Sequence, residues 1–470
     1  MLFSSISFLF IFFPVAILAY YLAPQKGKNF VLLAASLIFY AWGEPVYVVL
    51  LLLSSVFNYF GGLDIEAKRE EHRSAKRSLI FAIVINLLLL GFFKYYGFVM
   101  DNINAIVSVE IPYRELTVPI GISIYTLKAL SYLIDIYRKE AGAQKKFVNF
   151  ALYLALFPQM IAGPVERYTD MESQLEQRSW SPQRFGNGAI LFVCGLAKKV
   201  VLADTIGILQ EEITGLQMGT FSVLTAWIGC AAFAFRFYFE LSGYADMAIG
   251  LGRIFGFDLH RNFYYPYLSR SVSEFWKRWN VSVTTWFRVY VFEPMGGGEK
   301  GIPGAFWNLL IVGALAGFWY GPEWRFLWWG IYCGILLIME KYVWGQVLYK
   351  LPRLIQHIYT IALVFMGWTF FFSPDLGAAL DYIGVMFGAG ASALVDRQAL
   401  YFLMTHWMIL VLCILGVSTR GNTVIQSLID VPNSSQGKNI AANVIYSIIL
   451  LVSLAFLVTG MLDVGMIIQF

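Results

Sequence analysis

The chain has 470 residues, of which 59% are hydrophobic and only 14% are charged. A water-soluble domain of this size cannot bury so large an apolar share, so the composition excludes a soluble globular protein and predicts an all-α polytopic membrane protein. The formal net charge of +4 fits basic residues in cytoplasmic loops. No basic cluster is interleaved with aromatic residues on a soluble segment, so we expect no nucleic-acid partner. Four single cysteines without metal-type spacing predict neither a disulfide framework nor a metal site.

Apolar runs long enough to cross a bilayer, about 20 residues each, recur along the whole chain. They cover residues 5–24, 29–43, 46–62, 79–100, 116–136, 188–206, 221–240, 305–320, 324–345, 355–375, 398–417 and 441–468. We expect about eleven spanning helices and one or two re-entrant segments in a single transmembrane domain of residues 1–470. The first run lacks a preceding basic residue and a small-residue cleavage site, so we expect it to be a retained helix rather than a signal peptide.

The basic residues of the short loops predict the orientation of the chain. Lys26 and Lys28 follow the first run, and residues 66–77 form a second basic loop, so both loops are expected to be cytoplasmic. The turn at residues 43–45 and the acidic segment 101–115 then lie outside. The N-terminus is therefore predicted to be extracytoplasmic, in a multi-pass protein of the cell membrane.

Polar or helix-breaking residues interrupt two apolar segments in the first half of the chain. Within residues 119–140, Tyr125, Lys128 and Tyr132 are spaced three and four apart, so they share one helical face. This face either hydrogen-bonds to neighbouring helices, with Lys128 reaching toward the membrane interface, or belongs to a functional site. Within residues 156–168, two prolines and a glycine prevent one continuous helix, which predicts a re-entrant element lining a site.

Charged and aromatic residues are concentrated in two later stretches. Arg236, Glu240 and Asp246 lie inside one apolar run, and each charge would be costly alone at membrane depth, so we expect them to pair with one another. The densest polar and aromatic block follows at residues 262–298 and 317–330. So many Arg, Lys, Trp and Tyr side chains need a bundle interior or a water-filled cavity, which makes this block the first candidate for a functional site.

In this order, the stretches resemble the signature motifs of the membrane-bound O-acyltransferase (MBOAT) family, in particular its alginate O-acetylase and teichoic acid D-alanyl transfer branch. The matching positions include Pro119, Gly121, Tyr125, Asp135, Arg138, Pro158, Gly163, Arg167, Lys198, Lys199, Tyr244, Asp246, Trp276, Arg278, Trp279, Arg288, Trp319, Gly321 and Trp329. The resemblance covers about residues 1–350. It implies a ring of about eleven transmembrane helices around a central funnel, through which acyl groups pass from a cytoplasmic donor to an extracytoplasmic acceptor.

The chain departs from the family pattern at several polar positions, and three of them bear on the chemistry of acyl transfer. The family's Trp-His-Gly step is Trp319-Tyr320-Gly321 here, Asn280 replaces a second histidine, and Val289 replaces an aspartate. Imidazole suits the removal of a hydroxyl proton near pH 7, whereas a phenol, with an ordinary pKa of about 10, does not. Tyr320 is therefore expected to donate a hydrogen bond that polarises an acyl carbonyl.

Two other arrangements would supply a base. The positive charge of Arg278 or Arg288 would lower the pKa of Tyr320. Alternatively, His357 or His406, which lie in or beside late apolar runs, would reach the site in the folded protein. The other two histidines, His72 and His260, are expected to be solvated.

The resemblance implies catalytic positions at Tyr320 and Asn280. It implies substrate-binding positions, without a metal or a bound cofactor, at Trp276, Arg278, Trp279, Arg288, Trp319, Tyr125, Arg138, Arg167, Tyr244 and Asp246. The implied donor is an acetyl or other acyl thioester. The implied partners are a cell-surface polysaccharide, a secreted acetyltransferase and an acyl carrier protein. Three functions fit: an O-acyltransferase with a modified site, a catalytically degenerate member that acts as a scaffold in a polysaccharide export or modification complex, and a lipid or glycan transporter.

Overall fold

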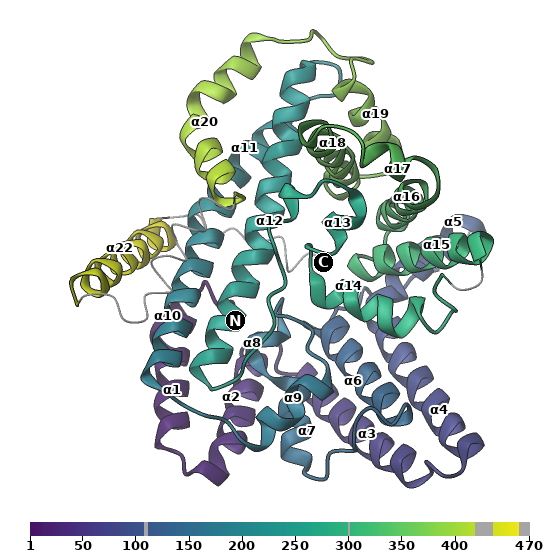
Figure 1. Cartoon of the computed structure of the whole chain (residues 1–470), viewed down its shortest axis with the longest axis vertical. Helices are drawn as coiled ribbons and strands as arrows, with labels where there is room; N and C mark the ends of the chain where they lie inside the picture. The colour runs from purple at the N-terminus through teal and green to yellow at the C-terminus, as the bar shows by residue number, and fades with distance from the viewer. Residues whose placement is uncertain (108–110, 299–300, 419–435, 460–470) are drawn as a thin grey trace. The chain divides into compact units, whose positions relative to one another are not determined.

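The computed structural model describes residues 1–107, 111–298, 301–418 and 436–459 of the chain. Within these ranges every regular element is a helix (Figure 1). Among the described residues, seven helices are long and apolar enough to cross a membrane, and three shorter apolar helices accompany them. The seven are Tyr47–Ala67, His72–Val107, Val223–Ile254, Pro303–Tyr320, Trp324–Leu348, Arg353–Phe372 and Arg397–Gly416. The prediction of an all-α polytopic fold is confirmed.

The helices form two compact units, residues 1–192 with 247–260 and residues 193–246 with 261–470. The first unit contains α1 (Phe13–Leu22), α2 (Lys28–Gly43), α3 (Tyr47–Ala67), α4 (His72–Leu90), α5 (Tyr96–Val107), α6 (Ile122–Tyr137), α7 (Phe147–Ala155), α8 (Phe157–Met160), α9 (Tyr168–Glu176), most of α10 (Pro182–Ala197) and the last turns of α12 (Val223–Ile254). The second unit contains α11 (Asp204–Thr214), the rest of α12, α13 (Val272–Trp276), α14 (Val281–Phe287), α15 (Gly301–Tyr320), α16 (Trp324–Met339), α17 (Gly345–Leu348), α18 (Arg353–Phe372), α19 (Leu376–Met386), α20 (Arg397–Gly416) and α22 (Gln436–Thr459).

The predicted break near Pro158 is present in the first unit. Helix α7 ends at Ala155, Leu156 leaves the helical conformation, and α8 begins with Pro158 in its first turn, where the missing N–H of proline removes no helical hydrogen bond. The backbone N–H of Phe157 donates to Ser36 Oγ of α2 at 3.1 Å. This bond satisfies a buried backbone group that water cannot reach, as a break at membrane depth requires.

The polar face of α6 lies in the interior of the first unit. Tyr125, Lys128 and Tyr132 are all buried. Lys128 Nζ donates to Gln159 Oε1 at 2.6 Å and to the carbonyl oxygen of Tyr153, and it lies 4.5 Å from the centre of the Tyr153 ring. The alternative in which Lys128 reaches toward the membrane interface is therefore wrong, because its ammonium group is fixed inside by neutral acceptors.

In the second unit, α15 and α16 approach closely through glycines. A Cβ atom on Gly317 would collide with the carbonyl oxygen of Phe326, and one on Gly330 would collide with the carbonyl oxygen of Gly313. Small residues spaced four apart allow such contact between membrane helices. This packing fixes the end of α15, where Tyr320 lies.

Candidate functional site

The structure brings together the two positions at which the family pattern has histidine. Asn280 Nδ2 donates to the hydroxyl oxygen of Tyr320 at 3.4 Å, although the two residues are 40 positions apart in sequence. Tyr320 is buried at the end of α15, and its ring contacts those of Trp319 and Trp329 at centroid distances of 5.3 and 5.2 Å. The second unit therefore contains a polar pair inside an aromatic core.

Asn280 is held at the start of α14 by the fold of the preceding loop. Its φ of 41° is in the left-handed region, which asparagine occupies more readily than most residues. The buried side chain of Asn262 accepts a hydrogen bond from the backbone N–H of Ser282 at 2.9 Å, and its carbonyl oxygen accepts one from Val281 at 2.9 Å. These bonds cap α14 and place Asn280 opposite Tyr320.

A residue that the sequence interpretation missed, Glu340, fixes the helix before Asn280. Its two carboxylate oxygens accept the backbone N–H groups of Val272 and Ser273 at 2.7 and 2.9 Å. These are the first two residues of α13, so the carboxylate caps a helix terminus that carries partial positive charge. An acidic residue within an apolar run marks such a role, and Glu340 in the run at residues 324–345 carried that signal.

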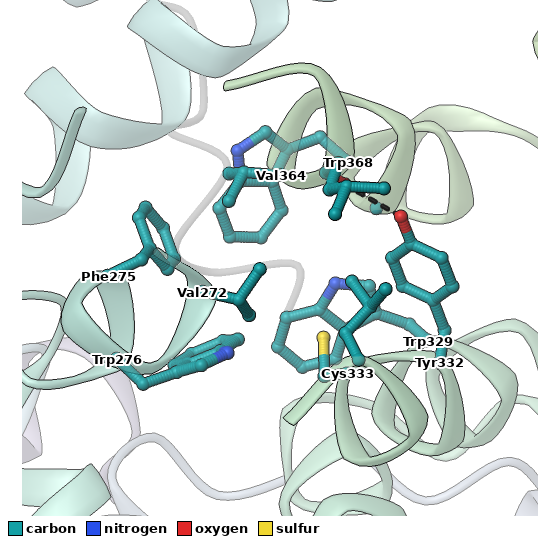
Figure 2. A pocket seen from close by; sticks show the side chains of 11 residues that line it. Val272, Phe275, Trp276, Trp329, Tyr332, Cys333, Val364 and Trp368 are labelled. Carbon is teal, nitrogen blue, oxygen red and sulfur yellow. Dashed lines mark hydrogen bonds between the residues drawn. The ribbon is translucent and has the colours of Figure 1, made fainter. Parts of the chain in front are cut away.

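An apolar pocket lies between α13, α16 and α18 (Figure 2). It is a small, partly open hollow. Trp276 and Phe275 line it from α13, Trp329 and Cys333 from α16, and Trp368 from α18. Because the Trp329 ring contacts both Trp276, at 5.6 Å, and Tyr320, a single tryptophan separates the pocket from the Asn280–Tyr320 pair.

Trp279, another predicted binding residue, belongs to the aromatic core beside this pocket. It is fully buried, and its ring lies 5.0 Å from that of Trp368 between centroids. Trp319 is partly buried and contacts Phe287 at 6.4 Å. Both tryptophans shape the walls around the polar pair.

The arginines do not place a positive charge beside Tyr320. Arg278 pairs with Glu274 at 2.6 Å, one helical turn away, and Arg288 is largely exposed and lies 3.5 Å from Glu293. Within the described part of the chain, neither guanidinium contacts the Tyr320 hydroxyl. The spacing of Glu274 and Arg278, four residues apart, already favoured this local pair.

The histidines do not replace the missing imidazole either. His357 Nδ1 lies 3.0 Å from the carbonyl oxygen of Ser269, and His406 Nδ1 lies 2.9 Å from Thr405 Oγ1. Among the residues that the structure describes, no histidine contacts Tyr320 or Asn280. The alternative in which His357 or His406 reaches the pair is therefore not supported.

Each of the three charges of α12 has an ion-pair partner outside that helix, which the expected mutual pairing did not predict. Asp246 accepts Lys198 Nζ at 2.6 Å, and Glu240 lies 3.4 Å from Lys199 Nζ. Arg236 pairs with Glu211 at 2.7 Å. Asp246 therefore belongs to a structural ion pair in the second unit. Tyr244, another predicted binding residue, is buried.

The remaining predicted binding residues, Tyr125, Arg138 and Arg167, belong to the first unit. Arg167 bridges buried Asp135 at 3.2 Å and Glu140 at 2.7 Å, and Arg138 lies 3.9 Å from Glu140. Tyr125 is buried. The two arginines thus take part in an acidic and basic network at the end of α6.

His260 differs from the expected solvated side chain. Its ring is exposed, but Nδ1 lies 2.7 Å from a carboxylate oxygen of buried Glu166, whose other oxygen accepts the His260 backbone N–H at 2.6 Å. This contact raises the pKa of His260 to about 9, through the hydrogen bond and the charge of Glu166. Asp170 lies close enough to complete a group of three possible metal ligands, but both oxygens of Glu166 already bind His260.

Residues 122–374, over half of the chain, match the family model described as MBOAT, membrane-bound O-acyltransferase family. The chain therefore belongs to this family of multi-pass membrane proteins, as the motifs predicted. It is 38% identical to the probable alginate O-acetylase AlgI of Azotobacter vinelandii, over 84% of this chain and 80% of that protein. It is 31% identical to the peptidoglycan O-acetyltransferase of Helicobacter pylori, over 86% of this chain and 83% of that protein. A teichoic acid D-alanyltransferase of Bacillus subtilis is 23% identical, over 48% of this chain and 61% of that protein.

Proposed function

We propose that the chain is a membrane-bound O-acyltransferase that passes acetyl groups from a cytoplasmic thioester to an acceptor outside the membrane. The acceptor is a cell-surface polysaccharide or a secreted acetyltransferase that acylates one, and the donor thioester is carried by a small molecule or an acyl carrier protein. The alginate and peptidoglycan acetylases among the relatives support this acceptor class. The basic residues Lys26 and Lys28 support a cytoplasmic first loop and an extracytoplasmic N-terminus.

The observation that carries the proposal is the contact between Asn280 and Tyr320. A phenol has one O–H donor and two acceptor lone pairs, and Asn280 occupies a lone pair. No described residue accepts the proton of Tyr320, so this proton is available for the carbonyl oxygen of an acyl group. A donor placed there stabilises the negative charge that develops on the oxygen in the transition state.

The apolar pocket beside the Asn280–Tyr320 pair favours a short acyl group as the group transferred. The hollow is small and its lining is mostly apolar, so a short acyl group suits it better than a long one. Trp276, Trp329 and Trp368 form part of this lining. In the transfer, the acceptor hydroxyl forms the new C–O bond, the C–S bond of the thioester breaks, and the hydroxyl proton leaves with the thiol. No described base contacts Tyr320, so rate enhancement rests on positioning and on the phenol donor.

The test is acetyl transfer by the purified, reconstituted chain with a labelled acetyl thioester and a polysaccharide acceptor. Tyr320→Phe removes only the hydroxyl and is expected to lower turnover about 100- to 1,000-fold, the usual effect of losing one donor to a developing oxyanion. The matched control is Tyr382→Phe, because the buried Tyr382 hydroxyl donates to Ala226 and does not contact the pair. Turnover of Tyr320→Phe within a few fold of the parent rules out the donor role.

A second candidate function, a catalytically degenerate scaffold, is favoured by the absence of any described histidine, carboxylate or cation in contact with Tyr320. It predicts no turnover by the parent chain. In that case, Tyr320→His combined with Asn280→His is expected to create activity. The positive φ at position 280 does not oppose this change, since histidine is also enriched in that region.

A further inference from the structure

A basic and aromatic pocket in the first unit is lined by none of the residues proposed for acyl transfer. It forms where α1 ends and α2 begins, against the loop before α10 and the end of α12. Tyr20, Tyr21 and Lys28 line one part, and Arg178, Trp180 and Gly256 line another. None of these residues has a role in the proposed reaction.

The two cations of the pocket have no acidic partner among the described residues. Lys28 Nζ lies over the rings of Tyr20 and Tyr21, 5.2 and 5.8 Å from their centres. Arg178 donates to three neutral oxygens, the Tyr20 hydroxyl at 3.3 Å, the carbonyl of Gln174 at 3.1 Å and Asn29 Oδ1 at 2.5 Å. A guanidinium carries five N–H groups, so two of them stay available in the same pocket as the ammonium group.

Neighbouring groups fix Arg178 in place before any ligand arrives. Gly256 has a φ of 87°, and a Cβ atom there would lie 3.2 Å from Arg178 Cβ, so only glycine leaves ordinary room for the arginine stem. The guanidinium also lies 4.3 Å from the centre of the Phe257 ring. A planar donor held in this way suits phosphate, which arginine binds through two parallel N–H groups.

The hydroxyl groups of Tyr20 and Tyr21 place no negative charge in the pocket. The Tyr20 hydroxyl donates to the carbonyl oxygen of Phe255 at 2.7 Å, and that of Tyr21 donates to the carbonyl oxygen of Ile254. Both protons are therefore used to cap the end of α12. The faces of the Tyr20 and Tyr21 rings, which attract cations, point toward Lys28.

The position of the pocket along the helices matches a membrane surface. It adjoins the end of the apolar helix Phe8–Leu22, and Trp180 at its edge is 55% exposed, as is typical of tryptophan at the membrane–water boundary. Lys28 belongs to the loop that is predicted to be cytoplasmic, and the cytoplasmic leaflet carries anionic phospholipids.

We propose that Lys28 and Arg178 form a binding site for a phosphate anion, as presented by the headgroup of an anionic phospholipid or by a soluble phosphate. The two cations bind the phosphate oxygens, and Tyr21 and Trp180 contact the apolar part that follows. The site is independent of acyl transfer, so its presence is tested without any turnover.

The experiment measures thermal unfolding of the purified full chain in an uncharged detergent. Phosphatidylglycerol is added at increasing mole fraction, with phosphatidylcholine and inorganic phosphate in parallel. A ligand of the folded state raises the unfolding temperature saturably, and we expect this with phosphatidylglycerol. Removing one lysine charge at a membrane surface lowers the affinity for anionic lipid about fivefold. Lys28→Met should therefore need at least about fivefold more phosphatidylglycerol for the same rise in unfolding temperature.

Two matched variants, Lys26→Met and Lys28→Arg, serve as controls for Lys28→Met. Lys26→Met removes an exposed charge from the same loop that does not line the pocket, so it should respond like the parent, and Lys28→Arg should retain binding. Protection by phosphatidylglycerol but not by inorganic phosphate identifies a lipid headgroup, and protection by inorganic phosphate that depends on Lys28 identifies a soluble ligand. The proposal is overturned if neither compound protects, if Lys28→Met responds like the parent, or if Lys26→Met loses as much as Lys28→Met.

Discussion

Replacing Glu340 with alanine should detach the start of α13 and loosen the aromatic pocket. Helix α13 has only five residues, Val272–Trp276, too few to be stable alone. The Glu340 side chain is only 3% exposed, and both of its oxygens bind the first backbone N–H groups of this helix. Glu340 therefore determines where Trp276 lies, and with it one wall of the pocket.

The expected loss of stability follows from the two bonds. Each buried N–H that loses its acceptor costs about 1–3 kcal/mol, so Glu340→Ala should lower the free energy of unfolding by about 2–6 kcal/mol. Glu340→Gln keeps one acceptor and turns an amide NH₂ toward the other N–H, so about half of this loss is expected. The control is Glu323→Ala, which removes a half-exposed carboxylate paired with Arg325, for which less than about 1 kcal/mol is expected.

Two measurements separate this local effect from general instability. Thermal unfolding in detergent ranks the three variants, and maleimide labelling followed by mass spectrometry reports access to Cys333, which lines the pocket. Labelling of Cys333 should become faster in Glu340→Ala, while labelling of Cys194, which does not line the pocket, should not change. The reasoning fails if Glu340→Ala is no less stable than Glu323→Ala, or if both cysteines become equally reactive.

Two further predictions concern stability. The pKa of His260 is raised to about 9 by Glu166, so the ion pair stabilises the fold fully below about pH 6.5 and ceases to do so as the pH rises through about 9. Thermal unfolding from pH 6 to 10 should show this loss, and a His260→Gln variant that keeps the same pH dependence would contradict it. Gly330→Ala should prevent α15 and α16 from approaching, because the new methyl group collides with the Gly313 carbonyl, and should lower the unfolding temperature by several degrees. Gly91→Ala, whose added Cβ meets no atom within 4 Å, should change it little, and equal effects of the two alanines would refute the close approach.

Much of the fold could be predicted because hydropathy and helix breakers act locally. Apolar runs marked each of the seven candidate spans that the described residues contain, fewer than the roughly eleven expected, and the prolines near residue 158 marked the break between α7 and α8. The motif order placed Asn280 and Tyr320 in one site, and the structure brings them into contact. Local patterns were enough for these features, because each feature depends on residues that are close in sequence or on a motif of the family.

The contacts that were missed join distant parts of the chain. Glu340 caps a helix 68 residues earlier in sequence, and no spacing rule reaches so far. The acceptors of Lys128, on Gln159 and Tyr153, become its partners only because the broken segment folds against α6. In both cases the sequence indicated that a buried charge needs a partner, whereas the identity of that partner depended on tertiary packing.

Three departures from the family pattern, at positions 280, 289 and 320, are physically consistent with one another. Asn280, Tyr320 and Val289 each replace a group that can carry charge by one that is neutral near pH 7. A single ionisable group left in a membrane interior without its partner is costly, so the loss of one such group favours the loss of the others. For the same reason, if the parent chain is the inactive scaffold, Tyr320→His alone should create less activity than Tyr320→His with Asn280→His, because the first places an imidazole in an aromatic core without a partner to orient it. In labelled acetyl transfer the two changes should therefore be more than additive; additive effects would show that the two positions act independently, despite the 3.4 Å contact between their side chains.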